Sequence, residues 1–82
     1  MTLVLYYRPF CAYSRRVMNF AEEHGIPLSL RNIHEHPDIR NELIKIGGKA
    51  QIPCLVIDGK ALYESNDILA WMEKNLEEIK RS

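Results

Sequence analysis

The sequence predicts an α/β domain in which helices cover both faces of a four-stranded mixed sheet, in the order βαβαββα. Two observations carry this prediction. Short apolar runs alternate with segments whose apolar residues recur at helical spacing, and an Asp-Gly pair separates the last two apolar runs. The 82 residues suffice for one hydrophobic core, so we expect residues 1–82 to form a single domain.

The first half of the chain reads as strand, helix, strand. Residues 2–7 are rich in Leu, Val and Tyr and are followed by Pro9, which predicts a buried first strand. Apolar residues fall at helical spacing over residues 12–24, and Gly25 suits the end of that helix. Apolar and polar residues alternate over residues 28–33, which predicts a half-exposed strand near an edge of the sheet.

The second half begins with a helix and a hairpin. Pro37 is tolerated in the first turn of a helix, and the apolar spacing that follows it stops at Gly47-Gly48. Residues 55–57 and 61–63 flank Asp58-Gly59, a pair that readily adopts the positive φ angles of a type I′ turn. We therefore expect two antiparallel strands.

A last helix is expected after the hairpin. Ser65 is a suitable N-cap residue, and four apolar residues recur after it at near-helical spacing: Ile68, Met72, Leu76 and Ile79. These residues read as one face of a single helix packed on the core. A crossover between parallel strands should be right-handed.

Composition excludes several classes of function. The chain is 46% hydrophobic and 27% charged, and its 11 basic residues balance 11 acidic ones, so we expect no nucleic-acid partner. The longest apolar stretches, residues 3–7 and 52–57, are too short to span a bilayer, and residues 1–7 lack the features of a signal peptide. We expect a cytoplasmic protein with no membrane anchor.

The two cysteines and three histidines do not form a metal motif. Cys11 and Cys54 are too few for a disulfide framework and have no paired Cys/His spacing. His34 and His36 stand beside Pro37 in a short polar stretch that reads as a loop. We assign no metal to these residues.

Cys11 stands where the first strand is expected to give way to the first helix. A cysteine at a helix N-terminus has its thiolate stabilised by unpaired backbone N–H groups, and a cation such as Arg8 adds to this effect. Open α/β sheets tend to bind ligands at the carboxyl ends of their strands, where this residue should lie. Cys11 is therefore a candidate nucleophile; the alternative is a small buried cysteine.

Three segments carry a resemblance to known families. With the order of elements, Cys11-Ala12-Tyr13-Ser14, Gln51-Ile52-Pro53 and Glu64-Ser65-Asn66-Asp67 resemble a glutaredoxin across essentially the whole chain. The last segment is also similar to the glutathione transferase N-terminal domain, in which a Glu-Ser pair holds the γ-glutamyl end of glutathione. Both families imply a thioredoxin-like fold. Full transferases carry a further helical domain, which this sequence does not include, so a complete transferase is disfavoured.

The resemblance implies a monothiol active site. Cys11 would be the thiolate that attacks a glutathione mixed disulfide and becomes glutathionylated itself. Ser14 occupies the position of the second cysteine of dithiol glutaredoxins. Its Oγ is either a donor to the Cys11 thiolate or part of an ordinary first helical turn. Tyr13 matches an aromatic residue that shields the sulfur, and Cys54 reads as a small core residue, with a resolving thiol as the alternative.

The resemblance also implies a glutathione site. Arg8 would face a glutathione carboxylate. Ile52-Pro53 would be a cis peptide bond whose first residue pairs with the cysteinyl unit of glutathione. Glutaredoxins usually have Gly-Gly where this chain has Tyr63-Glu64, so the resemblance does not settle the backbone contacts to glutathione at this turn. The similarity to transferases implies instead that the Glu64 side chain helps to hold the γ-glutamyl end of glutathione. The implied glutathione-binding residues are Arg8, Tyr13, Gln51, Ile52, Pro53, Glu64, Ser65, Asn66 and Asp67.

Different functions follow from this resemblance. The first is a glutathione-dependent thiol-disulfide oxidoreductase that acts on glutathionylated proteins or small disulfides, with glutathione as cosubstrate and a monomeric chain. The second is a dimeric [2Fe-2S] cluster carrier in which Cys11 and glutathione of each chain ligate the cluster. The third is a glutathione-binding module without turnover, related to the transferase N-terminal domain.

Overall fold

The computed structural model describes residues 1–81 and confirms the predicted order of elements through the hairpin. Up to the hairpin, each helix and strand falls within a few residues of its expected range. The elements are β1 (Leu3–Tyr7), α1 (Ala12–Glu23), β2 (Ser29–Asn32), α2 (Pro37–Gly47), β3 (Cys54–Ile57), β4 (Lys60–Tyr63), α3 (Ser65–Lys74) and α4 (Leu76–Arg81).

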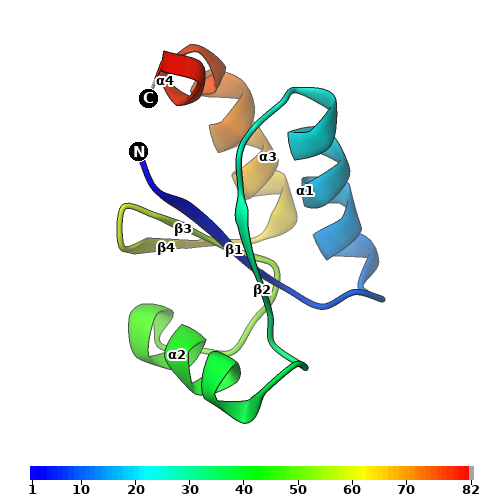
Figure 1. Cartoon of the computed structure of the whole chain (residues 1–82), viewed down its shortest axis with the longest axis vertical. Coiled ribbons are helices and arrows are strands. Elements are labelled where there is room, and N and C mark those ends of the chain that lie inside the picture. The colour runs from blue at the N-terminus through cyan, green and yellow to red at the C-terminus, as the bar shows by residue number, and fades with distance from the viewer. Residues whose placement is uncertain (82) are drawn as a thin grey trace.

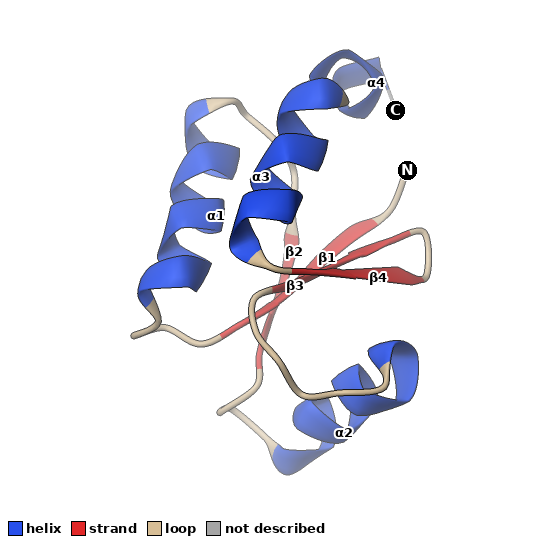
Figure 2. Ribbon diagram, turned by 180° about the vertical axis from the view of Figure 1, so that it is seen from behind, coloured by secondary structure: helices blue, strands red, loops and turns tan. Residues whose placement is uncertain are grey.

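The sheet has the strand order β2-β1-β3-β4. β1 pairs in parallel with β2 and antiparallel with β3, and β3 pairs antiparallel with β4. Figures 1 and 2 show α1 and α3 on one face of the sheet and α2 on the other. The prediction that the second strand lies at an edge is confirmed.

The hairpin between β3 and β4 forms as its turn residues predict. Asp58 and Gly59 have φ angles of 47° and 87°, the positive values that a type I′ turn requires at both central positions. Ile57 pairs with Lys60 directly across this turn. The local Asp-Gly signal therefore sets the register of the last two strands.

Each face of the sheet has its own hydrophobic cluster. The cluster beneath α1 and α3 includes the buried residues Leu5, Val17, Leu55, Ile68 and Met72. The cluster beneath α2 consists of Tyr6, Ile39, Leu43, Cys54 and Val56. Neighbouring residues of one strand point to opposite faces, so β1 and β3 supply side chains to both clusters.

The end of the chain differs from the prediction in two ways. The expected single helix is interrupted at Asn75, whose Nδ2 donates to the Trp71 carbonyl oxygen at 2.8 Å, and α4 begins at Leu76. An Asn side chain that bonds the backbone locally competes with helix continuation. Ser65 is the first residue of α3, and the N-cap residue is Glu64, which makes no side-chain cap hydrogen bond.

An ion pair fastens α2 to the sheet. Arg31 of β2 donates from Nε and Nη2 to the two carboxylate oxygens of Glu42, at 3.2 and 2.9 Å. The hydroxyl of Tyr6 donates to the same carboxylate. Burial and the contact with Glu42 raise the pKa of Tyr6 to about 12, so its hydroxyl keeps its proton at neutral pH.

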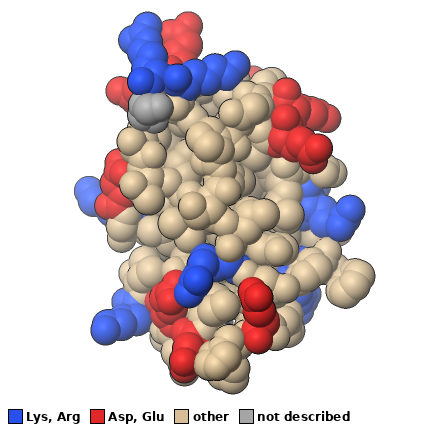
Figure 3. Space-filling view, viewed as in Figure 1, with Lys and Arg blue, Asp and Glu red and all other residues tan. Residues whose placement is uncertain are grey.

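Charges of both signs are distributed around the rim of the face shown in Figure 3, and its centre is largely uncharged. This face has no broad basic patch of the kind that binds a polyanion. Among residues 1–81, no helix is long and apolar enough to cross a membrane.

Candidate functional site

A tight turn presents Cys11 at the start of α1. The Cys11 N–H donates to the Arg8 carbonyl oxygen at 3.2 Å, which closes a turn with Pro9 and Phe10 at its corners. Proline favours the second position of such a turn because its φ angle is already fixed. Cys11 is the N-cap residue of α1, with extended φ and ψ angles of −99° and 120°. The predicted location at the strand-helix junction is confirmed.

The surroundings of Cys11 favour its thiolate. Burial raises the pKa of the Cys11 thiol, but the N–H and hydroxyl of Ser14, the N–H of Tyr13 and the charge of Arg8 together lower it below its ordinary value. The neutral thiol makes no hydrogen bond that caps the helix. The stabilisation therefore acts on the charged form, as expected at a helix N-terminus.

Ser14 is fully buried behind the cysteine. Its Oγ accepts from the Arg8 N–H at 3.5 Å, so the lone pairs of the hydroxyl face the turn. The hydroxyl proton remains free to point toward Cys11, where it lowers the pKa of the thiol. The sequence left two readings of this serine open, and its contact with the cysteine favours the donor.

The Ile52–Pro53 peptide bond is cis, as the resemblance implied. Tyr6 pairs with Cys54 across β1 and β3, so the next pair in this antiparallel register brings Pro53 opposite Tyr7. The loop that ends at Pro53 therefore lies beside the turn that carries Cys11. The sequences of the loop and of the turn do not by themselves show that the two lie side by side.

A cavity of about 450 Å³ lies beside these loops. It brings together seven of the predicted glutathione-binding residues: Tyr13, Gln51, Ile52, Pro53, Glu64, Ser65 and Asn66. Arg8 and Asp67 are exposed and do not line this cavity. The three segments that carried the resemblance thus meet at one place in the fold.

A hydrogen bond between Gln51 and Glu64 crosses this cavity's wall. Gln51 Nε2 donates to Glu64 Oε1 at 2.7 Å. Glu64 has a φ angle of 70°, in the left-handed region that favours glycine. A glycine would adopt that conformation without strain. The pair has no sequence signal, because 13 positions separate its members.

Cys54 belongs to the other face of the sheet. Its side chain has 0% exposure and lies in the cluster beneath α2, which is consistent with the predicted core role. Burial raises the pKa of the Cys54 thiol, and contacts with Tyr63 and Lys49 offset this only in part. The Tyr63 hydroxyl donates to the Lys49 carbonyl oxygen at 2.9 Å and so fastens β4 to the loop after α2.

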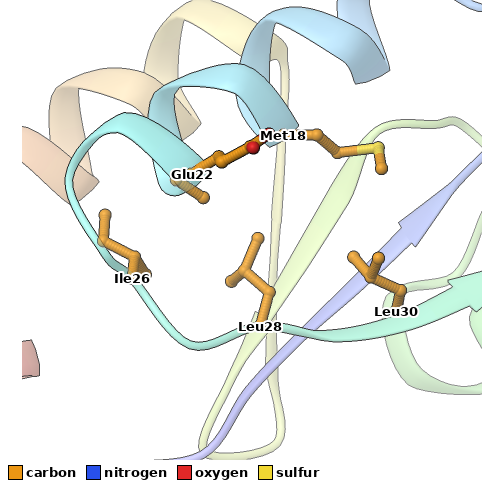
Figure 4. A pocket seen from close by; sticks show the side chains of 6 residues that line it. Met18, Glu22, Ile26, Leu28 and Leu30 are labelled. Carbon is orange, nitrogen blue, oxygen red and sulfur yellow. The ribbon is translucent and has the colours of Figure 1, made fainter.

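An apolar cavity of about 220 Å³ lies between α1 and β2, away from Cys11. Figure 4 shows Met18, Ile26, Leu28 and Leu30 directed into it. This region holds no thiol and no cation, so it offers no chemistry of its own. Among residues 1–81, no group of three or more His, Cys, Asp or Glu side chains is arranged to hold a metal ion. His36 instead accepts from the Asp38 N–H and caps α2.

A cis-proline facing a cysteine at the first helix is typical of thioredoxin-like domains, and the comparisons with known proteins agree with that class. The family model of the glutathione S-transferase N-terminal domain matches residues 10–75. The chain therefore belongs to the glutathione S-transferase N-terminal domain family. The similarity to glutaredoxins in particular stays a prediction.

Solved transferases share this fold. Glutathione transferase Omega 3C from Trametes versicolor is 31% identical with a TM-score of 0.82, and the match covers 96% of this chain and 35% of that one. Human glutathione transferase theta-2 is 28% identical with a TM-score of 0.80, and the match covers 92% of this chain and 32% of that one. This chain therefore spans about a third of the length of these relatives.

Proposed function

We propose that this protein is a glutathione-dependent thiol-disulfide oxidoreductase that reduces glutathione mixed disulfides by a monothiol mechanism. The observation that carries the proposal is the lowered pKa of the Cys11 thiol beside a cavity lined by the cis-proline and the start of α3. We further propose that residues 1–82 act as one domain, in the cytoplasm, where thiols are kept reduced.

The reaction needs one protein sulfur. The Cys11 thiolate attacks the glutathione sulfur of a mixed disulfide, forms a new S–S bond to glutathione and releases the other thiol as a thiolate. A second glutathione thiolate then attacks the glutathione sulfur bound to Cys11, which yields glutathione disulfide and restores the Cys11 thiolate. Two electrons pass from glutathione to the substrate, and Ser14 stabilises the thiolate at both steps.

The cavity supplies complementary groups for glutathione. The N-terminus of α3 offers unpaired backbone N–H groups at Ser65 and Asn66 to the γ-glutamyl carboxylate. The Glu64 carboxylate can accept a hydrogen bond from the γ-glutamyl ammonium when that bond replaces the one from Gln51 Nε2. The backbone of Ile52, before the cis-proline, is suited to pair with the cysteinyl unit as an added strand would.

The test is glutathione-dependent reduction of the mixed disulfide between glutathione and 2-mercaptoethanol. We expect Cys11→Ser to abolish turnover and Cys54→Ser to retain it, with circular dichroism showing both variants folded. Loss of turnover in a folded Cys54→Ser protein would replace the monothiol cycle with a two-cysteine mechanism. A folded parent without turnover would refute the catalytic proposal.

The same preparation tests the cluster carrier. Four thiolates are needed for a [2Fe-2S] centre, and one chain with one glutathione supplies two, so a cluster requires a dimer. Protein purified anaerobically with glutathione would then be coloured and dimeric. A colourless monomer with turnover supports the oxidoreductase, and a colourless protein that binds glutathione without turnover supports the binding module.

A further inference from the structure

We infer that a second cavity beside Cys11 receives the leaving half of the mixed disulfide, and that it favours an aromatic thiol bearing an anionic group. This inference rests on the proposed function. The cavity has a volume of about 490 Å³ and is lined by Arg8, Pro9, Phe10, Asn32 and His34. It shares no lining residue with the cavity at the cis-proline.

Phe10 is the first observation behind this inference. Its side chain is 95% exposed, the highest value among the large apolar residues of the described chain, and it directly precedes the nucleophile. The turn that carries it is held by the bond from the Cys11 N–H to the Arg8 carbonyl oxygen. The ring is therefore presented to solvent by an ordered turn, and burial against a ligand would remove apolar area from water.

The charge of the cavity is the second observation. Arg8 brings a guanidinium group, and His34 and Asn32 bring polar groups from the loop after β2. None of the described residues lining it is acidic. The Asn32 Oδ1 already accepts from the His34 N–H at 2.9 Å, which orders this wall. A ligand with an apolar body and a carboxylate complements these groups, because a guanidinium group pairs with carboxylates and a phenyl ring packs against aromatic rings.

The position of the cavity relative to Cys11 is the third observation. Residues 8–10 line the cavity and are joined to Cys11 within one turn. In the exchange reaction the leaving sulfur is separated from the Cys11 sulfur by roughly two S–S bond lengths, about 4 Å. A ring bonded to that sulfur is close enough to contact this turn. A small polar thiol such as 2-mercaptoethanol has no group to fill the cavity.

The experiment compares two substrates in one set of variants. The first is the mixed disulfide of glutathione with 5-thio-2-nitrobenzoate, an aromatic carboxylate, and the second is that of glutathione with 2-mercaptoethanol. We expect Phe10→Ala and His34→Ala to lower kcat/KM for the first about fivefold to tenfold and to leave the second within twofold. Ile46→Ala, which removes another exposed apolar side chain outside these cavities, should change neither.

A binding measurement separates this inference from the proposed function. The S-methyl thioether of the same nitrobenzoate cannot react, and it should shift the amide NMR signals of Phe10, Asn32 and His34. Such shifts without turnover of either disulfide would refute the proposed function and retain a site for aromatic anions. Turnover with equal losses on both substrates, or without shifts at these three residues, would overturn the inference.

Discussion

The two cysteines of this domain lie on opposite sides of one sheet and have opposite acid-base properties. Cys11 is 7% exposed at the N-terminus of α1, and Cys54 is 0% exposed in the cluster beneath α2. Burial raises the pKa of both thiols, but only at Cys11 do Ser14, Tyr13 and Arg8 lower it below the ordinary value. Burial alone therefore does not decide thiol reactivity; the oriented N–H and O–H groups do.

The largest effect should be in alkylation of the native protein. We expect iodoacetamide at pH 7 to modify Cys11 at least about 100-fold faster than Cys54, because Cys11 is the more ionised and the more accessible thiol. Peptide mass spectrometry at timed intervals measures both rates. Both cysteines should react in denaturant, and comparable rates in the folded protein would contradict the comparison.

Ser14→Ala should have the next largest effect. Loss of a charge-assisted hydrogen bond, worth roughly 1.5 kcal/mol, should raise the pKa of the Cys11 thiol and slow its alkylation about tenfold at pH 6.5. The difference should vanish at pH 10, where the thiol is ionised in both proteins. Ser29→Ala, at an exposed position of β2, is the matched control. An unchanged pH profile would assign Ser14 to packing alone.

Tyr63→Phe removes one hydroxyl on the other face. The Tyr63 hydroxyl donates to the Lys49 carbonyl oxygen and so holds the loop that leads to the cis-proline at the glutathione cavity. We therefore expect Tyr63→Phe to raise the KM for glutathione mixed disulfides about threefold and to leave the alkylation rate of Cys11 unchanged. The free energy of unfolding should fall by about 1 kcal/mol. A change in the alkylation rate would show that the two faces are coupled.

The smallest effect should be in the pH dependence of stability. The Cys54 pKa is raised in the folded state, so its contribution to stability is present at neutral pH and is lost as pH rises above the unfolded pKa. The Cys11 pKa is lowered, so its contribution is complete above the unfolded pKa and is lost as pH falls through the folded pKa. The free energy of unfolding, measured with urea between pH 7 and 10, should fall less steeply with pH in Cys54→Ala than in the parent protein. In Cys11→Ala it should fall more steeply than in the parent. Parallel curves would contradict this.

Local sequence signals account for most of the fold. The Asp58-Gly59 pair gave the hairpin, and the end of an apolar run before Cys11 gave the junction with α1. The break at Asn75 was missed, because the apolar spacing continues across it while the amide bonds Trp71. Ser65 was misplaced by one residue, because Glu64 adopts a φ angle that its residue type does not suggest.

The sequence by itself determined the order of elements, the edge position of the second strand and the candidate nucleophile, because these follow from periodicity and turn chemistry along the chain. Tertiary structure decided which distant residues meet. It brought Gln51 to Glu64, joined Asn32 and His34 to the turn of Phe10, and separated Cys54 from Cys11 by the sheet. These neighbourhoods depend on strand register and packing, which no local pattern encodes.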